Sequence, residues 1–275
     1  MVSFPNCKIN LGLHILRKRS DGYHELETVF YPIGLTDVLE IIETRNGKTS
    51  VHLSTSGLPV EGRPANNLCV RAYRLLQKDF PFLEPMLIHL HKVIPAGAGL
   101  GGGSANASFA LQMINEIAGL GLTQQQLLHY AAQLGSDCPF FVINKPCYAT
   151  GRGEILEEFE LDLSGYSIVL VNPGIHVDTG VAFSGIIPAM PEYPIKEILQ
   201  QPVSQWKFKL QNDFEKTVFK RYREIVDIKD SLYQQGALYA SMSGSGSTVY
   251  GIFEKDNVPE LSFPADYFVK ILPGK

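Results

Sequence analysis

The chain has 275 residues, of which 45% are hydrophobic and 19% charged, and its formal net charge is −4. These are ordinary values for a globular protein, and the length allows one large domain or two smaller ones. A net negative charge argues against a nucleic-acid-binding protein, which needs a basic surface to neutralise phosphates. No uncharged apolar run approaches the roughly 18 residues of a membrane span, and the start of the chain lacks the pattern of a signal peptide.

The cysteines also narrow the class of protein. Cys7, Cys69, Cys138 and Cys147 are far apart in the sequence and form no CxxC pair, so neither a zinc site nor a dense disulfide framework is indicated. We therefore expect free thiols in a reducing, cytoplasmic compartment. The sequence sets no oligomeric state.

The first predicted element is a strand over residues 7–15, "CKINLGLHI". Its odd positions are apolar and its even positions include Lys8 and Asn10, which predicts one buried face with these two side chains together on the other. The turn "KRSDGYH" follows, in which Asp21-Gly22 supplies turn chemistry. Further strands are expected at 25–33 and 37–44.

A helix is expected from Asn67 to about Asp79, because apolar residues recur there at helical spacing. A strand over 86–94, "MLIHLHKVI", leads into a glycine-rich loop and a second helix. His89 and His91 alternate on that strand without a third ligand, which favours a solvated face over a metal site. The next helix opens with a capping box at Thr123 and is expected to end in a left-handed cap at Gly135.

The second half begins with an acidic connection over 151–162. A buried strand at 166–171 leads towards a helix, and a long helix is expected over 212–235. A strand, a glycine- and serine-rich loop and another strand follow at 237–253, and a last strand lies at 266–272. Because strands and helices mix without regular βαβα alternation, we expect an α+β protein of two lobes.

The glycine-rich loop "GAGLGGG" contains a literal GxGxxG at Gly97, Gly99 and Gly102. A dinucleotide-binding fold is rejected, because a second helix rather than a strand follows and the nearby acid, Glu116, lies inside the first helix. A P-loop is rejected because no Lys-Ser or Lys-Thr follows the glycines. A protein kinase would need HRD and DFG, and neither motif occurs.

The remaining alternatives for this loop are a flexible linker and a phosphate cradle. Glycines let the backbone approach a ligand closely, and a helix N-terminus adds unpaired N–H donors and a partial positive charge. Because a strong helix follows the glycines at once, the pattern favours a cradle for a polyanion, most simply a triphosphate.

Three segments taken together resemble the motifs of the GHMP kinases, which phosphorylate small molecules. They are "NCKINLGL", "IPAGAGLGGGSANA" and "SMSGSGSTVYGIF", in that order. The branch whose acceptor is 4-diphosphocytidyl-2-C-methyl-D-erythritol fits best, through "DGYH", "NNLCVRA", "LGSDCPFF" and "NPGIHVDTGVAF". The departures are Ser104-Ala105-Asn106 where that branch has Ser-Ser-Asn, and Asn6-Cys7 where it has Pro-Ala.

The resemblance implies a two-lobed GHMP kinase fold with the active site in the cleft between lobes. An N-terminal ATP-binding domain would cover residues 1–154 and a C-terminal substrate-binding domain residues 155–275. The implied reaction moves the γ-phosphoryl group of ATP to the 2-hydroxyl of the acceptor, in non-mevalonate isoprenoid precursor biosynthesis. No acidic metal ligand is evident, so Mg²⁺ is expected to arrive with ATP.

The same resemblance implies the catalytic residues. Asp137 would be the base that takes the proton of the acceptor hydroxyl, and Lys8 would pair with it and stabilise the moving phosphoryl group. From the residues alone, Asp137 also fits a structural turn and Lys8 a solvated strand lysine.

The binding residues follow in the same way. Tyr23 and His24 would hold the cytosine, with Phe183 stacked on the base and Thr179 near the nucleoside, although Phe183 also fits a plain core position. Lys92 fits a solvated strand edge as well as an adenine contact. The nucleotide-binding residues are expected to be Asn67, Lys92, Pro95, Ala96, Gly97, Ala98, Gly99, Leu100, Gly101, Gly102, Gly103 and Ser104. The substrate-binding residues are expected to be Asn10, Tyr23, His24, Asn106, Thr179, Phe183, Ser243, Gly244 and Gly246.

Rival functions remain open at this stage. Another GHMP kinase would act on a sugar, homoserine or mevalonate and would have no cytosine to hold. A non-catalytic nucleotide-binding protein would not need both Lys8 and Asp137. The predicted partner is a small molecule, with no nucleic acid and no membrane.

Overall fold

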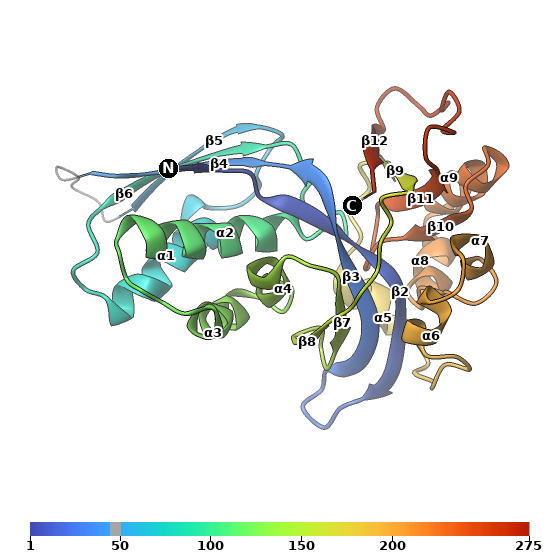
Figure 1. The fold of residues 1–275 in the computed structure, drawn as a ribbon, viewed down its shortest axis with the longest axis horizontal. Coiled ribbons are helices and arrows are strands. Elements are labelled where there is room, and N and C mark those ends of the chain that lie inside the picture. The colour runs from blue at the N-terminus through green and yellow to red at the C-terminus, as the bar shows by residue number, and fades with distance from the viewer. Residues whose placement is uncertain (45–50, 275) are drawn as a thin grey trace. The chain divides into compact units, whose positions relative to one another are not determined.

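The computed structural model describes residues 1–44 and 51–274 (Figure 1). Its contacts divide the chain into two compact units, each assembled from separate segments. Unit 1 comprises Met1–Cys7, Leu35–Ala96 and Gly101–Asn144, and unit 2 comprises Lys8–Gly34, Gly97–Leu100 and Lys145–Lys275. The domain boundary after residue 154 stays a prediction, since the units interleave along the chain rather than meeting at one point.

Unit 1 is built on a sheet with the strand order β1-β4-β6-β5. Its strands are β1 (Val2–Ser3), β4 (Val38–Glu43), β5 (Val51–Gly57) and β6 (Met86–Lys92). β6 pairs antiparallel with β4 and parallel with β5. Met86, Ile88 and Leu90 alternate with more exposed residues along β6, so this strand presents one apolar face to the core.

The helices of unit 1 cover that apolar face, and α1, α2 and α3 all lie on the same side of the sheet in Figure 1. They are η1 (Pro64–Asn66), α1 (Leu68–Asp79), α2 (Gly102–Ile117), α3 (Gln124–Leu134) and α4 (Cys138–Ile143). Tyr73, Leu111 and Ile114 are fully buried between helices and sheet. The predicted capping box at Thr123 is confirmed, with both of its hydrogen bonds to Gln126 present.

Unit 2 contains a sheet with the order β2-β3-β7-β8 and another with the order β10-β11-β9-β12. The strands of the former are β2 (Asn6–Lys18), β3 (His24–Thr36), β7 (Cys147–Thr150) and β8 (Ile155–Glu158). The strands of the latter are β9 (Tyr166–Asn172), β10 (Tyr239–Met242), β11 (Val249–Glu254) and β12 (Phe268–Pro273). β11 pairs antiparallel with β10 and β9, and β9 pairs with β12, which confirms the predicted strands around the second glycine-rich segment, residues 243–246, and at the end of the chain.

The helices of unit 2 are, in chain order, α5 (Thr179–Ser184), α6 (Ile195–Leu199), α7 (Val203–Trp206), α8 (Glu215–Arg221) and α9 (Arg223–Gln234). Of these, α5, α8 and α9 bury apolar residues in the same core as β9. Ile225, Ile228 and Leu232 form the buried stripe of α9 and belong to the same hydrophobic cluster as Val169 and Val171 of β9. Both units mix helices and strands, so the predicted α+β class is confirmed.

The structure corrects the prediction for β2. The odd positions are buried as expected, but Lys8 and Asn10 are only 3% exposed, so both faces of the strand are covered. The reading of Lys8 as a solvated strand lysine is therefore wrong. Polar side chains at this depth need hydrogen-bond partners, which no sequence pattern identifies.

Two helix predictions are also wrong. Gly135 ends α3 with φ 173°, which is extended backbone rather than a left-handed cap. The predicted helix over 212–235 is interrupted at Tyr222, whose φ of −128° and ψ of 92° break the helical path between α8 and α9. Both helices still bury their apolar residues in one cluster, and helical periodicity alone cannot reveal such a break.

Candidate active site

The glycine loop adopts a conformation that requires glycine. Gly97 and Gly99 have φ of 63° and 77°, in the left-handed region. A Cβ atom at Gly99 would lie 2.0 Å from the carbonyl oxygen of Ser243, so the two glycine-rich segments of unit 2 touch through their backbones. Gly97 lies beside His176, whose Nδ1 would be 3.3 Å from a Cβ at that position. The reading of the loop as a linker is wrong, and His176 is a neighbour of the loop that sequence reasoning missed.

The loop runs on into α2, which begins at Gly102. Its N-cap is Gly101, with φ 69°, and glycine brings no side chain to accept from the first N–H groups of the helix. The α2 N-terminus therefore presents backbone donors and the positive end of the helix dipole, with Ser104 in its first turn. This arrangement fits a bound phosphate.

In unit 2, the structure brings Lys8 and Asn10 to the glycine loop. The Lys8 ammonium donates to the Asn10 side-chain oxygen and, at 3.3 Å, to the carbonyl oxygen of Gly99. The Lys8 backbone N–H donates to Leu100 at 3.0 Å, so β2 runs directly alongside the loop. A buried lysine held in this way places a positive charge next to the loop.

The second glycine-rich segment, residues 243–246, contacts both the glycine loop and β2. The Ser243 hydroxyl donates to the Gly99 carbonyl at 2.8 Å and accepts from the Asn10 backbone N–H at 3.2 Å. Gly244 and Gly246 have φ of 56° and 91°, so this loop also depends on glycine. Lys8, Asn10, Gly99 and Ser243 thus form one hydrogen-bonded cluster.

The residues expected to hold the cytosine also lie in unit 2. The rings of His24 and Phe183 stack on each other, with centroids 4.8 Å apart and planes 16° from parallel. Phe183 also meets Phe214 edge-on, and Tyr23 is 56% exposed beneath the Arg152 guanidinium. A base that stacks on Phe183 at this face would have to replace His24 there. Arg152 and Phe214 were not anticipated.

Thr179 is exposed at the start of α5. Its hydroxyl lies 3.4 Å from that of Ser245 in the second glycine-rich segment. The structure therefore brings the predicted nucleoside contact next to that loop.

Lys92 and Asn106, in unit 1, are engaged by a buried carboxylate. Oδ2 of Asp37 accepts from the Lys92 ammonium and from the Asn106 amide, and Oδ1 accepts from the backbone N–H groups of Val93 and Ile94. Lys92 is only 5% exposed, so its reading as a solvated edge lysine is wrong. We call this set the Asp37 anchor. Nucleotide and substrate roles for Lys92 and Asn106 stay predictions.

The remaining predicted residues of unit 1 lie at helix ends and in the loop. Asn67 is the N-cap of α1, and its side chain accepts from the Cys69 backbone N–H at 2.9 Å. Pro95 and Ala96 continue the chain after β6 and are partly or fully exposed. The nucleotide contacts expected of these three residues stay predictions.

Asp137 lies half-buried at the N-terminus of α4. The next residue, Cys138, ties this end of α4 to α2, because its carbonyl oxygen accepts from the Ser108 hydroxyl at 2.7 Å. Burial raises the pKa of the Cys138 thiol to about 11, against the opposing effect of a hydrogen bond with the Ser104 hydroxyl. The expected base is therefore next in sequence to a residue that touches the first turn of α2.

The described residues hold no group of three or more His, Cys, Asp or Glu side chains placed to bind a metal ion. His89 and His91 instead form hydrogen bonds with Ser54 and Ser56 of β5. Over the same part of the chain, no helix combines the length and apolarity that a membrane crossing demands.

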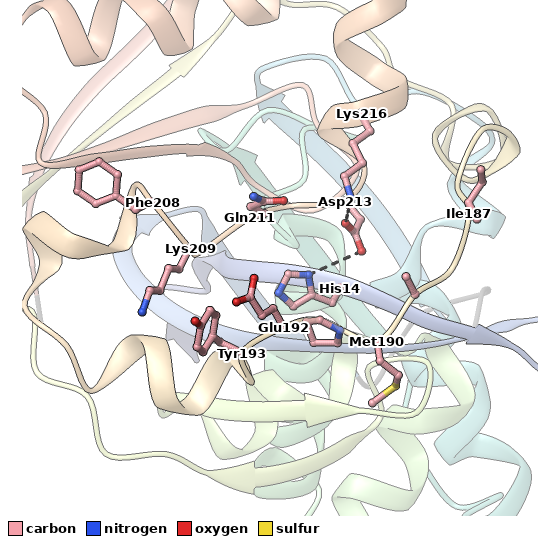
Figure 2. A pocket seen from close by; sticks show the side chains of 12 residues that line it. His14, Ile187, Met190, Glu192, Tyr193, Phe208, Lys209, Gln211, Asp213 and Lys216 are labelled. Atoms are coloured by element: carbon pink, nitrogen blue, oxygen red, sulfur yellow. Dashed lines mark hydrogen bonds and ion pairs between the residues drawn. The ribbon is translucent and has the colours of Figure 1, made fainter.

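Unit 2 also has a cavity of about 480 Å³ that none of the predicted site residues lines. Figure 2 shows His14 and Lys216 both directed at Asp213 in its wall, at 3.7 Å and 2.8 Å. Burial raises the pKa of Asp213, but hydrogen bonds from His14, Lys216 and the Ile15 backbone outweigh it and bring the pKa to about 2. Asp213 is therefore ionised at neutral pH.

Comparison with known proteins agrees with this geometry. Residues 67–145 match the profile of the GHMP kinases N terminal domain, and residues 196–262 match the GHMP kinases C terminal profile. The chain is similar to the 4-diphosphocytidyl-2-C-methyl-D-erythritol kinases of Bacteroides fragilis, at 51% identity over 97% of both chains, and of Porphyromonas gingivalis, at 45% identity over 93% of both.

Solved structures show the same fold. A crystal structure of 4-(cytidine 5'-diphospho)-2C-methyl-D-erythritol kinase matches all of both chains, with a TM-score of 0.82 and 28% identity. A mevalonate kinase matches with a TM-score of 0.70 and 12% identity over 100% of this chain and 99% of its own, a likeness of fold alone. The chain therefore belongs to the GHMP kinases and, within them, to the family of 4-diphosphocytidyl-2-C-methyl-D-erythritol kinases.

Proposed function

We propose that the chain transfers the γ-phosphoryl group of ATP to the 2-hydroxyl of 4-diphosphocytidyl-2-C-methyl-D-erythritol, releasing ADP and the 2-phosphate, a step of non-mevalonate isoprenoid precursor biosynthesis. The observation that carries this proposal is the position of Lys8. Its ammonium is held at the Gly99 carbonyl of the glycine loop, on the strand whose Asn10 is bonded to Ser243. Membership of the family supplies the identity of the acceptor.

The triphosphate is proposed to bind the backbone donors of the glycine loop and the first turn of α2. Within the loop, the left-handed glycines set the direction of the N–H groups, and at α2 the glycine N-cap leaves the first N–H groups without a side-chain acceptor. Ser104 supplies a hydroxyl at the same helix end, and Mg²⁺ enters as the ATP complex and neutralises phosphate charge.

Asp137 is proposed to accept the proton of the acceptor 2-hydroxyl, and Lys8 to stabilise the charge that develops on the moving phosphoryl group. The phosphoryl group passes directly from ATP to the acceptor oxygen, so catalysis consists of positioning and electrostatics. A phosphorylated protein trapped with labelled ATP would contradict this direct transfer.

His24 and Phe183 are proposed to select the cytosine, His24 through a hydrogen bond to the base edge and Phe183 by stacking. Tyr23 packs near the base, and Thr179 lies beside the nucleoside. Their mutual stack means that the two rings separate when the base binds. The reaction is proposed to take place in the cytoplasm, in keeping with the buried thiols of Cys7, Cys69, Cys138 and Cys147.

Coupled release of ADP from Mg·ATP tests the function. We expect turnover with the cytidyl diphosphate acceptor and none with mevalonate, homoserine or galactose. Asp137→Asn should lower turnover by ~10²-fold or more while keeping ATP affinity within a few-fold, because only the proton acceptor is lost. Asp230→Asn, the same change on the exposed side of α9, is the matched control.

Each other outcome removes one part of the proposal. Turnover with a different acceptor would keep the phosphate cradle and overturn the cytosine site. Near-normal turnover of Asp137→Asn would remove Asp137 as the base. No turnover with any acceptor would reduce the chain to a nucleotide-binding protein.

A further inference from the structure

Residues 211–215, which we call the clamp segment, form hydrogen bonds both with β2 and with the second glycine-rich segment, within unit 2. On one side the segment docks on β2. The Leu13 backbone N–H donates to Gln211 at 2.9 Å, and the Asp213 N–H donates back to Leu13 at 2.8 Å. The Ile15 N–H donates to the Asp213 carboxylate at 2.9 Å. These bonds fix the clamp segment to the strand that carries Lys8 and Asn10.

On its other side the clamp segment holds the loop through Asn212. Its side-chain Nδ2 donates to the carbonyl oxygens of Met242, at 2.7 Å, and Gly244, at 2.8 Å. These carbonyls lie on either side of Ser243, so the amide straddles that residue. The Asn212 side-chain oxygen accepts from the Phe214 N–H at 3.0 Å, and the residue is 2% exposed. Both ends of the amide are therefore engaged, and its orientation is fixed.

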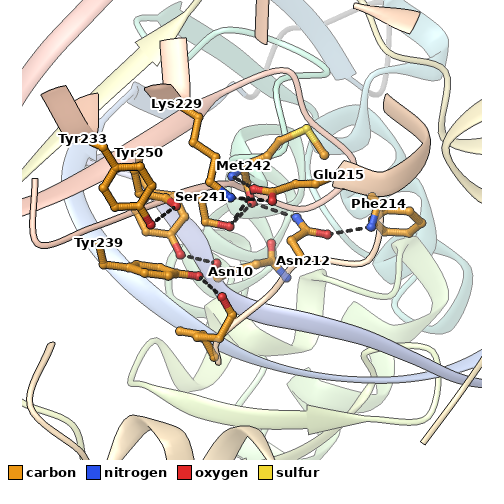
Figure 3. Close-up of polar contacts among 12 residues, drawn as sticks. Asn10, Asn212, Phe214, Glu215, Lys229, Tyr233, Tyr239, Ser241, Met242 and Tyr250 are labelled. Carbon is orange, nitrogen blue, oxygen red and sulfur yellow. Dashed lines mark hydrogen bonds and ion pairs between the residues drawn. The ribbon is translucent and has the colours of Figure 1, made fainter. Parts of the chain in front are cut away.

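Glu215 adds a hold on the strand before the loop, as Figure 3 shows. Its Oε1 accepts from the Met242 N–H at 2.8 Å and from the Ser241 hydroxyl at 3.0 Å, while Lys229 donates to its Oε2 at 2.6 Å. This carboxylate fixes the residue that precedes Ser243. Asn212 acts at Ser243 itself.

Ser243 connects Asn212 to the glycine loop and to β2 through hydrogen bonds. Its hydroxyl is bonded to the Gly99 carbonyl and to the Asn10 N–H, and Lys8 donates to the same Gly99 carbonyl. Tyr250 ties the other side of the same strand position, by donating to the Asn10 carbonyl at 2.8 Å. A chain of contacts thus runs from Asn212 through Ser243 to Gly99 and Lys8. It links Asn212 to the glycine loop although the two are far apart in the sequence.

We propose that Asn212 is a positioning residue for phosphoryl transfer, which acts by fixing the Ser243 peptide so that the Ser243 hydroxyl holds the glycine loop against β2. This proposal rests on the proposed function for its activity readout. Displacement of the loop by about 1 Å would be enough to lower turnover by ~10²-fold, because the reacting atoms must meet at a short distance.

Asn212→Asp is the first variant, because it keeps the shape of the side chain and turns a carboxylate oxygen towards the two carbonyl groups that the amide now binds. We expect kcat to fall by ~10²-fold with KM for ATP and for the acceptor within about three-fold. Asn115→Asp is the matched control, since the Asn115 amide ties the backbone of Leu122 in unit 1. That variant should keep kcat within about two-fold.

A double-mutant cycle with Ser243→Ala separates positioning from a general loss of stability. If Asn212 acts through Ser243, the double variant should be no slower than the slower single variant. Multiplicative losses would overturn the proposal, as would wild-type kcat in Asn212→Asp.

Hydrogen–deuterium exchange supplies a readout that does not need turnover. Asn212→Asp should speed exchange at residues 97–100 and 241–247, whereas Asn115→Asp should leave both segments unchanged. If the wild-type protein phosphorylates no acceptor, the proposed function fails while exchange still decides the positioning role. Unchanged exchange at residues 97–100 in a folded Asn212→Asp protein would overturn the positioning role of Asn212. If that variant does not fold, Asn212→Ser is measured in the same way.

Discussion

Asp37 in unit 1 and Asn212 in unit 2 both fix backbone next to glycine-rich sequence, but one does so as a charged carboxylate and the other as a neutral amide. Asp37 is fully buried, is paired with the Lys92 ammonium and accepts from Val93 and Ile94, which precede the glycine loop in the chain. Asn212 is equally buried but neutral, and it holds Ser243 through two carbonyl oxygens.

The two regions differ in how many hydrogen-bonding groups remain available to a ligand. The donors to Asp37 fill the roughly four lone-pair sites of a carboxylate, so the anchor is complete without a substrate. The neutral Asn212 amide instead fixes Ser243, which is hydrogen-bonded to Gly99 and Asn10 beside the residues proposed to act on phosphate. We therefore expect the ionic region around Asp37 to contribute mainly to stability, and the Asn212 contact to contribute mainly to the geometry of the reaction.

The largest expected effect comes from breaking the ionic region. Asp37→Asn should lower the free energy of unfolding by about 3–5 kcal/mol, because it leaves the buried Lys92 charge without its carboxylate. Urea unfolding followed by circular dichroism measures this change. Glu158→Gln, which breaks an exposed pair with Lys145, should change stability little. Adding Lys92→Met to Asp37→Asn should restore part of the loss, and failure to do so would show that the charge is not the cause.

The next effect breaks contact between the glycine-rich segments. Gly99→Ala places a methyl group 2.0 Å from the Ser243 carbonyl at φ 77°, so the backbone has to shift. Turnover should fall by ~10²-fold. Gly22→Ala is the control, since φ there is 84° but nothing lies within 4 Å. Equal activity losses in the two variants would mean that backbone strain, not the close approach, is responsible.

A smaller effect tests the one carboxylate on the outer side of the clamp segment. The pKa of Asp213 is lowered from 3.8 to about 2, so its ionised form favours the folded state. That stability is present above about pH 4 and is lost as the pH falls towards 2. Asp213→Asn should cost on the order of 2 kcal/mol at pH 7 and progressively less below pH 4. A difference that stays constant down to pH 2 would contradict this assignment.

The smallest expected effect leaves both regions intact. Phe183→Leu should raise KM for the cytidyl acceptor by ~10-fold through lost stacking, with KM for ATP and the melting temperature nearly unchanged. Phe219→Leu, at another partly buried position of the same core, is the control. Equal changes in both KM values would place Phe183 in the core alone.

Much of the fold could be predicted from the sequence, because apolar periodicity identifies β9, β11 and α1 well. The same signal for β6 also places Lys92 on the face shared with Met86, Ile88 and Leu90, and this parity could have shown that Lys92 is buried. Its partner Asp37 lies 55 residues away, and no local pattern connects them.

In the candidate site, too, some residues could be predicted from the sequence and others could not. Gly97 and Gly99 could be expected from motifs, because their backbone conformations require glycine, and Ser243 because it lies in a glycine-rich motif. Asn212 and His176 could not, since their importance lies in which backbone they touch. The stack of His24 on Phe183 was also beyond sequence, which indicates residue types but not their contacts.

The glycine N-cap of α2 has a thermodynamic consequence. Many helices carry a serine, threonine, aspartate or asparagine side chain that caps the first turn, whereas Gly101 supplies none. In the proposed binding mode a phosphate oxygen of the nucleotide takes that place, so the nucleotide would act as a removable cap of the helix. By linkage, the melting temperature rises with the logarithm of nucleotide concentration above the dissociation constant, so occupancy of the enzyme can be followed by its thermal stability.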